Sequence, residues 1–226
     1  MKISTGSSDF DRLLGGGVAE GILYDIYGEA GSGKTQLCFS LCANCARAGD
    51  DIFFIDTSGT FRPERIVEVA GSENVLGRIK YQRVFSTAEQ YSALSKAYEI
   101  SPRLIIVDST TSLFSAEFTG FMRHLKLAEY LHNLASAAVT CRWSVVATNM
   151  IRASLPQAND AALPEPTRVV GQREFLTRTV STFAHVKIGL KVLDPSGGGR
   201  EARMTQPERR KCVFVVTNKG IVDLQN

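Results

Sequence analysis

The stretch GEAGSGKTQLC, residues 28–38, decides the fold of this 226-residue chain. The pattern G-x-x-x-x-G-K-[ST] falls within it, at Gly28, Gly33, Lys34 and Thr35. An apolar run at residues 22–27 precedes the glycines, and apolar residues at helical spacing follow from Lys34 to Ala48. A glycine-rich loop between a strand and a helix is typical of proteins that bind nucleotide phosphates. The sequence therefore predicts an α/β fold whose first strand–helix turn cradles phosphate groups.

The chemistry of such a loop predicts a nucleotide and a metal ion. Backbone N–H groups approach the phosphate oxygens, and the following helix presents its positive end. We expect Lys34 to reach the terminal phosphates and the Thr35 hydroxyl to complete a Mg²⁺ shell, which makes ATP and Mg²⁺ the expected ligands. The residues expected to contact the nucleotide are Gly28, Glu29, Ala30, Gly31, Ser32, Gly33, Lys34, Thr35 and Gln36. A glycine-rich turn without a ligand is the alternative.

A second metal ligand is predicted at the end of another apolar run. Leu104–Asp108, LIIVD, is uncharged until its final carboxylate, as expected for a strand buried on both faces of a parallel sheet. Asp108 can then face the same Mg²⁺ across the sheet. An ordinary strand-end cap is the alternative.

The rest of the chain predicts a mostly parallel, doubly wound sheet with antiparallel strands at its C-terminal edge. Strands are expected at Ile52–Ile55, Ile79–Val84 and Ser144–Thr148, and helices at about Thr87–Glu99 and Leu125–Val139. Further strands are expected at Phe183–Val192, around Arg200–Met204 and at Cys212–Thr217, with turns at residues 197–199 and 218–220. Residues 150–171 contain three prolines and no periodicity, which is typical of a functional or a mobile loop. Residues 1–226 are expected to form one core domain.

Composition narrows the class of protein without deciding its function. A net charge of +3 permits contact with nucleic acid but does not require it. Five cysteines and no apolar run of membrane-spanning length favour a reduced protein in the cytoplasm. Cys38, Cys42 and Cys45 have the spacing of some iron–sulfur motifs, but they fall inside the predicted helix, where they are better explained as small buried residues.

Five separated segments carry a resemblance to a known family. They are STGSSDFDRLLGGGVAEGILYDIYGEAGSGKTQLC (residues 4–38), FIDTSGTFRPERI (54–66), LIIVDSTTSLF (104–114), VVATNMI (145–151) and VFVVTNKGIVD (213–223). In this order they resemble the ATPase core of the RecA-type recombinases of archaea and eukaryotes, closest to the archaeal RadB-like paralogue group. The resemblance implies a RecA-like P-loop core without the N-terminal helical domain of the polymerising members. It also implies ATP binding and a role in homologous recombination and DNA repair with recombinases or other repair proteins, in homo- or hetero-oligomers. A protein with this role is expected to associate with the nucleoid.

Two departures from the family pattern fall at the residues expected to handle the γ-phosphate. Ser58 stands where the family has a glutamate that orients the attacking water, and Met150 stands where it has a glutamine that senses the γ-phosphate. A hydroxyl is a poor base near neutral pH, and a thioether has no N–H to donate. No catalytic residue is therefore predicted, and ATP hydrolysis is expected to be weak or absent.

The resemblance also implies a base contact and two DNA-facing loops. It places Arg65 against the nucleotide base, with a surface salt bridge as the alternative. It assigns single-stranded DNA to loops at residues 115–126 and 150–171. The DNA-binding candidates are Phe118, Phe121, Arg123, Lys126, Arg152 and Arg168. For the first loop the alternative is a set of core anchors at a helix start, and for the second it is a solvated surface.

Three other functions stay open on the sequence. The first is a KaiC-like signalling ATPase, whose members share the GLDELLGGG type of opening segment. The second is an active DNA-stimulated ATPase that uses a carboxylate from a neighbouring subunit. The third is a structural subunit of a recombinase paralogue complex. The sequence does not decide whether ATP is hydrolysed, whether DNA is bound directly, or which oligomer forms.

Overall fold

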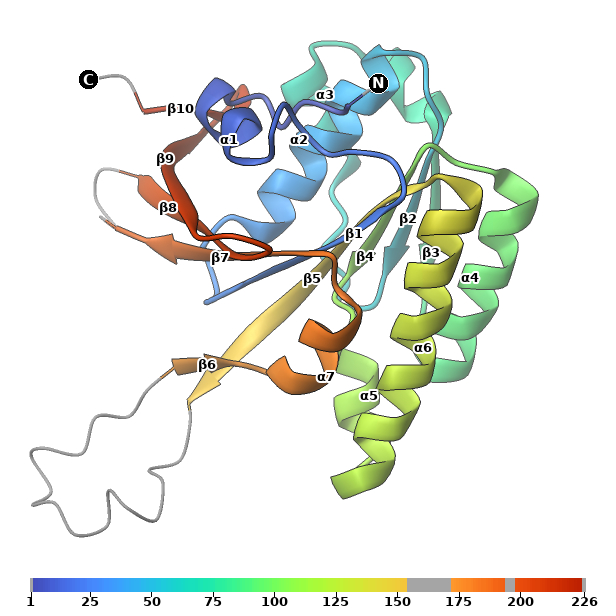
Figure 1. The fold of residues 1–226 in the computed structure, drawn as a ribbon. Coiled ribbons are helices and arrows are strands. Elements are labelled where there is room, and N and C mark those ends of the chain that lie inside the picture. The colour runs from blue at the N-terminus through green and yellow to red at the C-terminus, as the bar shows by residue number, and fades with distance from the viewer. Residues whose placement is uncertain (1, 154–171, 194–197, 225–226) are drawn as a thin grey trace, which may run out of the picture.

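A computed structural model describes residues 2–153, 172–193 and 198–224 (Figure 1). In these ranges one ten-stranded sheet has the order β10-β9-β8-β7-β1-β5-β4-β2-β3, and β6 pairs with β5 off this path. The strands are β1 Ile22–Gly28, β2 Ile52–Asp56, β3 Ile79–Arg83, β4 Leu104–Asp108, β5 Ser144–Ala153, β6 Gln172–Glu174, β7 Val186–Val192, β8 Gly199–Gln206, β9 Arg210–Thr217 and β10 Gly220–Asp223.

Helices cover both faces of the sheet (Figure 1). They are α1 Ser8–Leu13, α2 Lys34–Arg47, α3 Pro63–Ala70, the 3₁₀ turn η1 Glu73–Arg78, α4 Thr87–Ile100, α5 Ser112–Glu117, α6 Gly120–Cys141 and α7 Thr177–Phe183. The first four of these pack on one face, and α4 to α7 pack on the other. This double cover confirms the predicted doubly wound α/β architecture.

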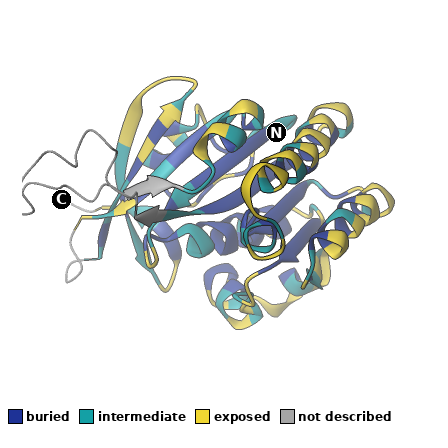
Figure 2. Cartoon of the chain, turned by 90° about the horizontal axis from the view of Figure 1, so that it is seen from below, coloured by how far each residue is buried: buried dark blue, intermediate teal, exposed yellow. Residues whose placement is uncertain are grey.

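Side-chain alternation along the central strands builds two cores from one sheet. In β2, Ile52 and Phe54 face α2 and α3, whereas Phe53 and Ile55 face α4 and α6. All five residues of β2 and of β4 are buried, which explains why their sequences are almost continuously apolar. Figure 2, a view from below, shows the buried strands between helices whose outer faces are exposed.

The parallel strands bring the predicted site residues to one edge. β1 pairs in parallel with β5 and β7, and β4 pairs in parallel with β5 and β2. The carboxyl ends of parallel strands meet at the same edge of a sheet, which is where open α/β sheets bind ligands. The loop that follows Gly28 therefore lies on the same edge as Asp108.

The antiparallel C-terminal edge is confirmed, and the boundaries of its strands differ by a few residues from the predicted ones. β7 pairs with β8, β8 with β9 and β9 with β10 in antiparallel register. Phe183, expected to begin a strand, ends α7, and β7 starts at Val186. The pattern misled because Phe183 and Ala184 are apolar for a different reason: they pack from the α7 end into the core beneath α6.

The prediction of a loop at residues 115–126 is wrong. α5 reaches Glu117, and α6 starts at Gly120, five residues before the predicted helix. The helix was predicted from a buried apolar stripe that includes Leu127, Leu131 and Leu134. Phe121, Met122 and Leu125 are exposed and do not belong to that stripe. Of the predicted second loop, residues 150–153 belong to β5, whereas residues 154–171 lie outside the described residues.

The first helix was not predicted, and it is fastened to the last strand. Ser7 caps α1 by accepting a hydrogen bond from the Phe10 N–H, and the Ser7 hydroxyl donates to Asp223 of β10. The Asp9 N–H donates to the same carboxylate over 2.9 Å, and the Phe10 ring lies 5.4 Å from that of Phe214. Within the described ranges, no helix combines the length and the apolar character needed to cross a membrane.

Candidate functional site

The loop between β1 and α2 requires glycine at its key positions. A Cβ on Gly28 would lie 2.4 Å from the Leu190 carbonyl oxygen and 2.7 Å from Ser32 Oγ, too close for any side chain. Gly31 and Gly33 have φ angles of +77° and +102°, a region that other residues rarely adopt. Gly33 is the N-cap of α2, so the loop leads directly into the positive end of that helix. The fold therefore builds the predicted cradle.

Lys34 lies folded back across this cradle. Its Nζ donates to the carbonyl oxygens of Gly28 and Glu29 over 2.9 and 2.8 Å. Burial lowers the pKa of Lys34, while the negative charge of Asp108 opposes that shift. Carbonyl oxygens are weaker partners than phosphate oxygens, so a triphosphate offers this ammonium group a better acceptor.

The structure brings Asp108 and Thr35 into direct contact. The Thr35 hydroxyl donates to Asp108 Oδ2 over 2.9 Å, and the Thr60 hydroxyl donates to the same oxygen over 3.0 Å. Thr148 donates to the other oxygen, Oδ1. A carboxylate ringed by hydroxyls, 4% exposed, offers the hard oxygen donors that Mg²⁺ prefers. The residues present therefore fit a magnesium ion between Thr35 and Asp108.

A cavity of about 310 Å³ opens over the loop. Its lining residues are Gly31, Gly33, Lys34, Thr35, Gln36 and Arg200. Ser32 Oγ is fully buried beneath it and, among the described residues, has no hydrogen-bond partner. Arg200 was not predicted for this site, because it is distant in sequence and only the pairing of β7 with β8 brings it near.

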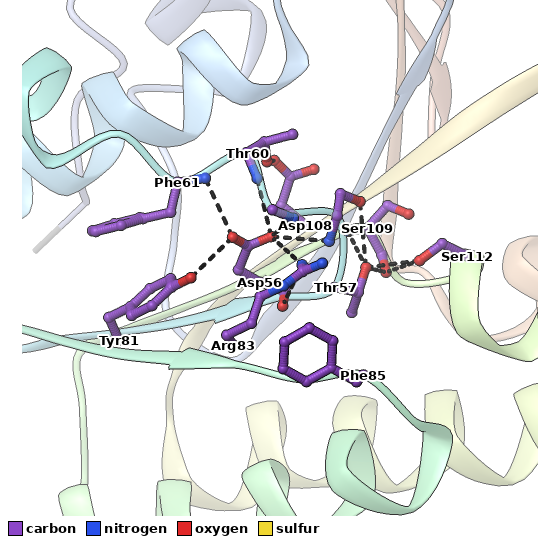
Figure 3. A network of polar contacts seen from close by, with 12 residues as sticks. Asp56, Thr57, Thr60, Phe61, Tyr81, Arg83, Phe85, Asp108, Ser109 and Ser112 are labelled. Atoms are coloured by element: carbon purple, nitrogen blue, oxygen red, sulfur yellow. Dashed lines mark hydrogen bonds and ion pairs between the residues drawn. The ribbon is translucent and has the colours of Figure 1, made fainter.

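The segment after β2 is organised around Asp56 (Figure 3). The carboxylate accepts hydrogen bonds from four backbone N–H groups, those of residues 58, 59, 60 and 61, at 2.7–3.3 Å. Tyr81 donates a further bond, and the Arg83 guanidinium lies 3.1 Å away and also stacks on the Phe85 ring. Burial alone would raise the pKa of Asp56, but the backbone donors hold it below its ordinary value. Asp56 therefore sets the path of the turn that carries Ser58.

Ser58 is exposed at the tip of this turn. Its Oγ lies 3.4 Å from the Thr57 hydroxyl, which in turn donates to the Ser109 carbonyl oxygen over 2.7 Å. The turn is attached to the metal-site carboxylate through Thr60. The position expected to hold a catalytic base thus has a defined place beside the cradle, and it carries a hydroxyl.

Met150 lies next to the first glycine of the loop. It pairs with Gly28 in the parallel register of β1 and β5. Its N–H donates to Asn149 Oδ1, and its carbonyl oxygen accepts from the Phe175 N–H, both over 2.9 Å. This backbone position connects the phosphate edge of the sheet to the segment before α7.

Arg65 is held by several protein groups. Its Nε donates to Gln36 Oε1 over 2.8 Å, and its Nη atoms donate to the carbonyl oxygens of Thr217 and Asn218. It also pairs with Glu68, so the salt bridge weighed as the alternative is present. Contact with a nucleotide base stays a prediction, which its place beside Gln36 permits.

The structure describes the side chains of four of the six DNA-binding candidates. Phe121 is 76% exposed, whereas Phe118 is half-buried with its ring 6.5 Å from that of Phe114. Arg123 donates to the Phe118 carbonyl oxygen over 2.7 Å and lies over the Phe175 ring, and Lys126 pairs with Glu129. The Arg152 side chain and the whole of Arg168 lie outside the described residues. DNA contact by any of these residues stays a prediction.

The three cysteines of the CxxxCxxC spacing lie inside a helix, which agrees with their interpretation as small buried residues. Cys38, Cys42 and Cys45 are buried in α2, and burial raises their thiol pKa values, that of Cys45 to about 12. In the described ranges, no three His, Cys, Asp or Glu side chains gather in a way that would hold a metal ion.

Comparison with known proteins agrees with the fold. A family model described as Rad51 matches residues 1–224. The DNA repair and recombination protein RadA of Cenarchaeum symbiosum (strain A) is 37% identical, over 75% of this chain and 46% of the relative. RadA of Metallosphaera sedula (strain ATCC 51363 / DSM 5348 / JCM 9185 / NBRC 15509 / TH2) is 34% identical, over 99% of this chain and 73% of the relative. The match therefore spans less than half the length of the first relative. The chain belongs to the Rad51 family of RecA-type recombinases.

Proposed function

We propose that this chain is an ATP-binding, RadB-like factor that assists homologous recombination and DNA repair and hydrolyses ATP weakly or not at all. One observation carries the proposal. The cradle, Lys34, Thr35 and Asp108 are assembled as a nucleotide site requires, whereas the turn beside them presents Ser58 in place of a base. A single RecA-like core that binds and is switched by nucleotide accounts for both facts.

The proposed mechanism starts with capture of the phosphate chain. Backbone N–H groups of the loop and the end of α2 receive the phosphate oxygens, and Lys34 leaves its two carbonyl partners for the terminal phosphates. Thr35 and Asp108 would hold Mg²⁺, which neutralises charge between the phosphates. The hydroxyls of Thr60 and Thr148 keep Asp108 oriented.

Hydrolysis is slow in this proposal because nothing at residue 58 takes a proton from water. A positioned general base contributes roughly 10²- to 10⁴-fold in rate. The Ser58 hydroxyl remains protonated near neutral pH and adds none of this. ATP then acts through binding, and it shifts the protein between states in proportion to its differential affinity for them.

The proposed readout runs through β5. Gly28 and Met150 are register partners, and Met150 is bonded through its backbone to Phe175, the residue under Arg123. A change in the loop on ATP binding therefore meets the segment proposed to face single-stranded DNA or a repair protein. Recombinases or other repair proteins, in homo- or hetero-oligomers in the cytoplasm, are the proposed partners.

The test measures binding and turnover together. Mg-ATP affinity is followed by calorimetry, and phosphate release is followed with and without single-stranded DNA. Lys34→Ala is expected to abolish binding, and Lys80→Ala, at an exposed lysine on β3, is the matched control. Tight binding with negligible release supports the proposal. Absence of ATP binding by the unchanged chain would contradict the proposed function.

Two other outcomes would favour the rival functions. Release per chain that rises with protein concentration and disappears in Lys34→Ala would indicate a carboxylate supplied by a neighbouring subunit. A closed hexamer whose turnover is indifferent to DNA would instead favour the KaiC-like alternative.

A further inference from the structure

Arg200 contacts the phosphate loop from a strand of the C-terminal edge. It is the second residue of β8, which is separated from β1 only by β7. Its Nε donates to the Gly31 carbonyl oxygen over 3.3 Å, and Nη1 donates to the Gly198 carbonyl oxygen. Arg200 and Lys34 are the two cationic side chains that line the 310 Å³ cavity over the loop.

The charge of Arg200 is not matched by a carboxylate within the described residues, and its known partners are neutral carbonyls. Arg203 on the same strand differs, because it pairs with Glu201 over 2.8 Å. A guanidinium gains most from a phosphate, which accepts two parallel hydrogen bonds and carries full charge. Arg200 thus has a weak set of partners beside the cavity that Lys34 and Thr35 line.

The loop itself makes room for this side chain. A Cβ on Gly33 would come within 3.3 Å of Arg200 Cδ and 3.5 Å of Val216 Cγ2. The missing side chain at Gly33 therefore lets the stem of Arg200 lie against the loop and directs its head to the cavity.

Arg200 and Asp108 approach the cradle from opposite sides of β1. Asp108 ends β4, beyond β5, whereas Arg200 comes from beyond β7. Thr35 and Asp108, which would hold Mg²⁺, therefore lie on one side of the cradle, and Arg200 offers a positive charge from the other.

We propose that Arg200 is a second cationic contact for the phosphate chain of a bound nucleotide, a role that rests on the proposed ATP binding. On binding, its head exchanges the Gly31 carbonyl for phosphate oxygens. The strand pair β7–β8 thereby becomes part of the nucleotide site, so the C-terminal edge is coupled to nucleotide occupancy.

Calorimetry with Mg-ATP and Mg-ADP tests this contact in Arg200→Gln, Arg200→Lys and the control Arg203→Gln. Arg200→Gln keeps most of the stem and a donor but loses the charge, so ATP is expected to bind about tenfold to a hundredfold more weakly. Arg200→Lys is expected to retain part of the affinity, and Arg203→Gln nearly all of it. The dependence of affinity on salt should also become shallower in Arg200→Gln, which a merely structural role would not produce.

The outcomes separate this inference from the proposed function. An equal loss for ATP and ADP assigns the contact to the α- or β-phosphate, and a loss for ATP alone assigns it to the γ-phosphate. Unchanged ATP affinity in Arg200→Gln, alongside lost affinity in Lys34→Ala, would overturn the Arg200 contact and leave the proposed function intact. Absence of ATP binding by the unchanged chain would remove both. Thermal unfolding of each variant checks that the comparison is between folded proteins, and Arg200→Lys carries the test if Arg200→Gln is unfolded.

Discussion

Thr60 donates a hydrogen bond to Asp108 over 3.0 Å, which joins the turn carrying Ser58 to the carboxylate proposed to hold Mg²⁺. Thr35 uses the same oxygen from the other side, so the two hydroxyls fix where Asp108 Oδ2 points. The metal site and the turn of residue 58 are therefore positioned as one unit.

This relationship predicts a metal-dependent defect in Thr60→Val. The substitution keeps the shape but removes the donor, and loss of such an orienting bond typically costs about 10- to 100-fold in metal affinity. The Mg²⁺ concentration needed for half-maximal ATP binding should rise by about tenfold or more. Titration of Mg²⁺ at fixed ATP measures it, with Thr60→Ser as the control that keeps the hydroxyl. An unchanged Mg²⁺ requirement in Thr60→Val would contradict the orienting role.

Ser58→Glu is expected to create turnover. The new carboxylate would stand on a turn already ordered by Asp56, and a positioned base contributes roughly 10²- to 10⁴-fold in rate. Phosphate release under saturating Mg-ATP checks this, with Ser58→Gln as the uncharged match. Lys34→Ala added to Ser58→Glu should remove the gain. Brisk release by the unchanged chain would show that another group already acts as the base.

Asp56→Asn is expected to destabilise the protein by roughly 2–4 kcal/mol, because the amide can present a donor to the backbone N–H groups of the turn and to Arg83. The pKa of Asp56 lies below its ordinary value of about 3.9, so its stabilisation is complete above that value. It is lost as the pH falls through the lowered pKa. Urea unfolding from pH 7 to pH 3 should therefore show a difference between the two proteins that narrows only below about pH 4. A difference that is constant over this range would exclude the ionised carboxylate as its source.

Gly28→Ala is expected to abolish ATP binding while the chain remains folded. The added methyl group meets the Leu190 carbonyl oxygen and Ser32 Oγ, so the loop must move away from the sheet. Gly77→Ala is the matched control, because nothing lies within 4 Å of the added Cβ there and the backbone angle is ordinary. Calorimetry with Mg-ATP and circular dichroism of both variants measure the outcome. Normal ATP affinity in Gly28→Ala would mean that the cradle tolerates a displaced loop.

The elements that follow local chemistry were predictable from the sequence. The glycine spacing fixed the loop at residues 28–35, and the continuous apolar run LIIVD identified β4 and placed Asp108 at its end. The buried cysteines of α2 could be recognised because helical spacing and a phosphate loop both required a helix there.

Features that depend on distant segments were not predictable in this way. The N-terminal part of α6 was not predicted, because its apolar residues are exposed and no buried apolar stripe marks its first turns. Arg200 was not predicted as a residue of the site, because the strand order brings it to the loop and its neighbours in sequence give no sign of this. Asp56 carried a local signal, since an acidic residue before Thr-Ser-Gly-Thr is typical of a turn that accepts backbone N–H bonds.

The three buried thiols of α2 can report how often this helix separates from the sheet. They lie on the helix whose first turn forms the cradle, and raised pKa values together with burial keep them as unreactive thiols in the folded chain. A thiol reagent can modify them only when α2 separates from the sheet. Their rate of modification therefore measures local unfolding of α2 and the phosphate loop. A ligand that binds the cradle slows that modification by an amount set by its concentration and its affinity, so the rate measures ligand binding without any added label.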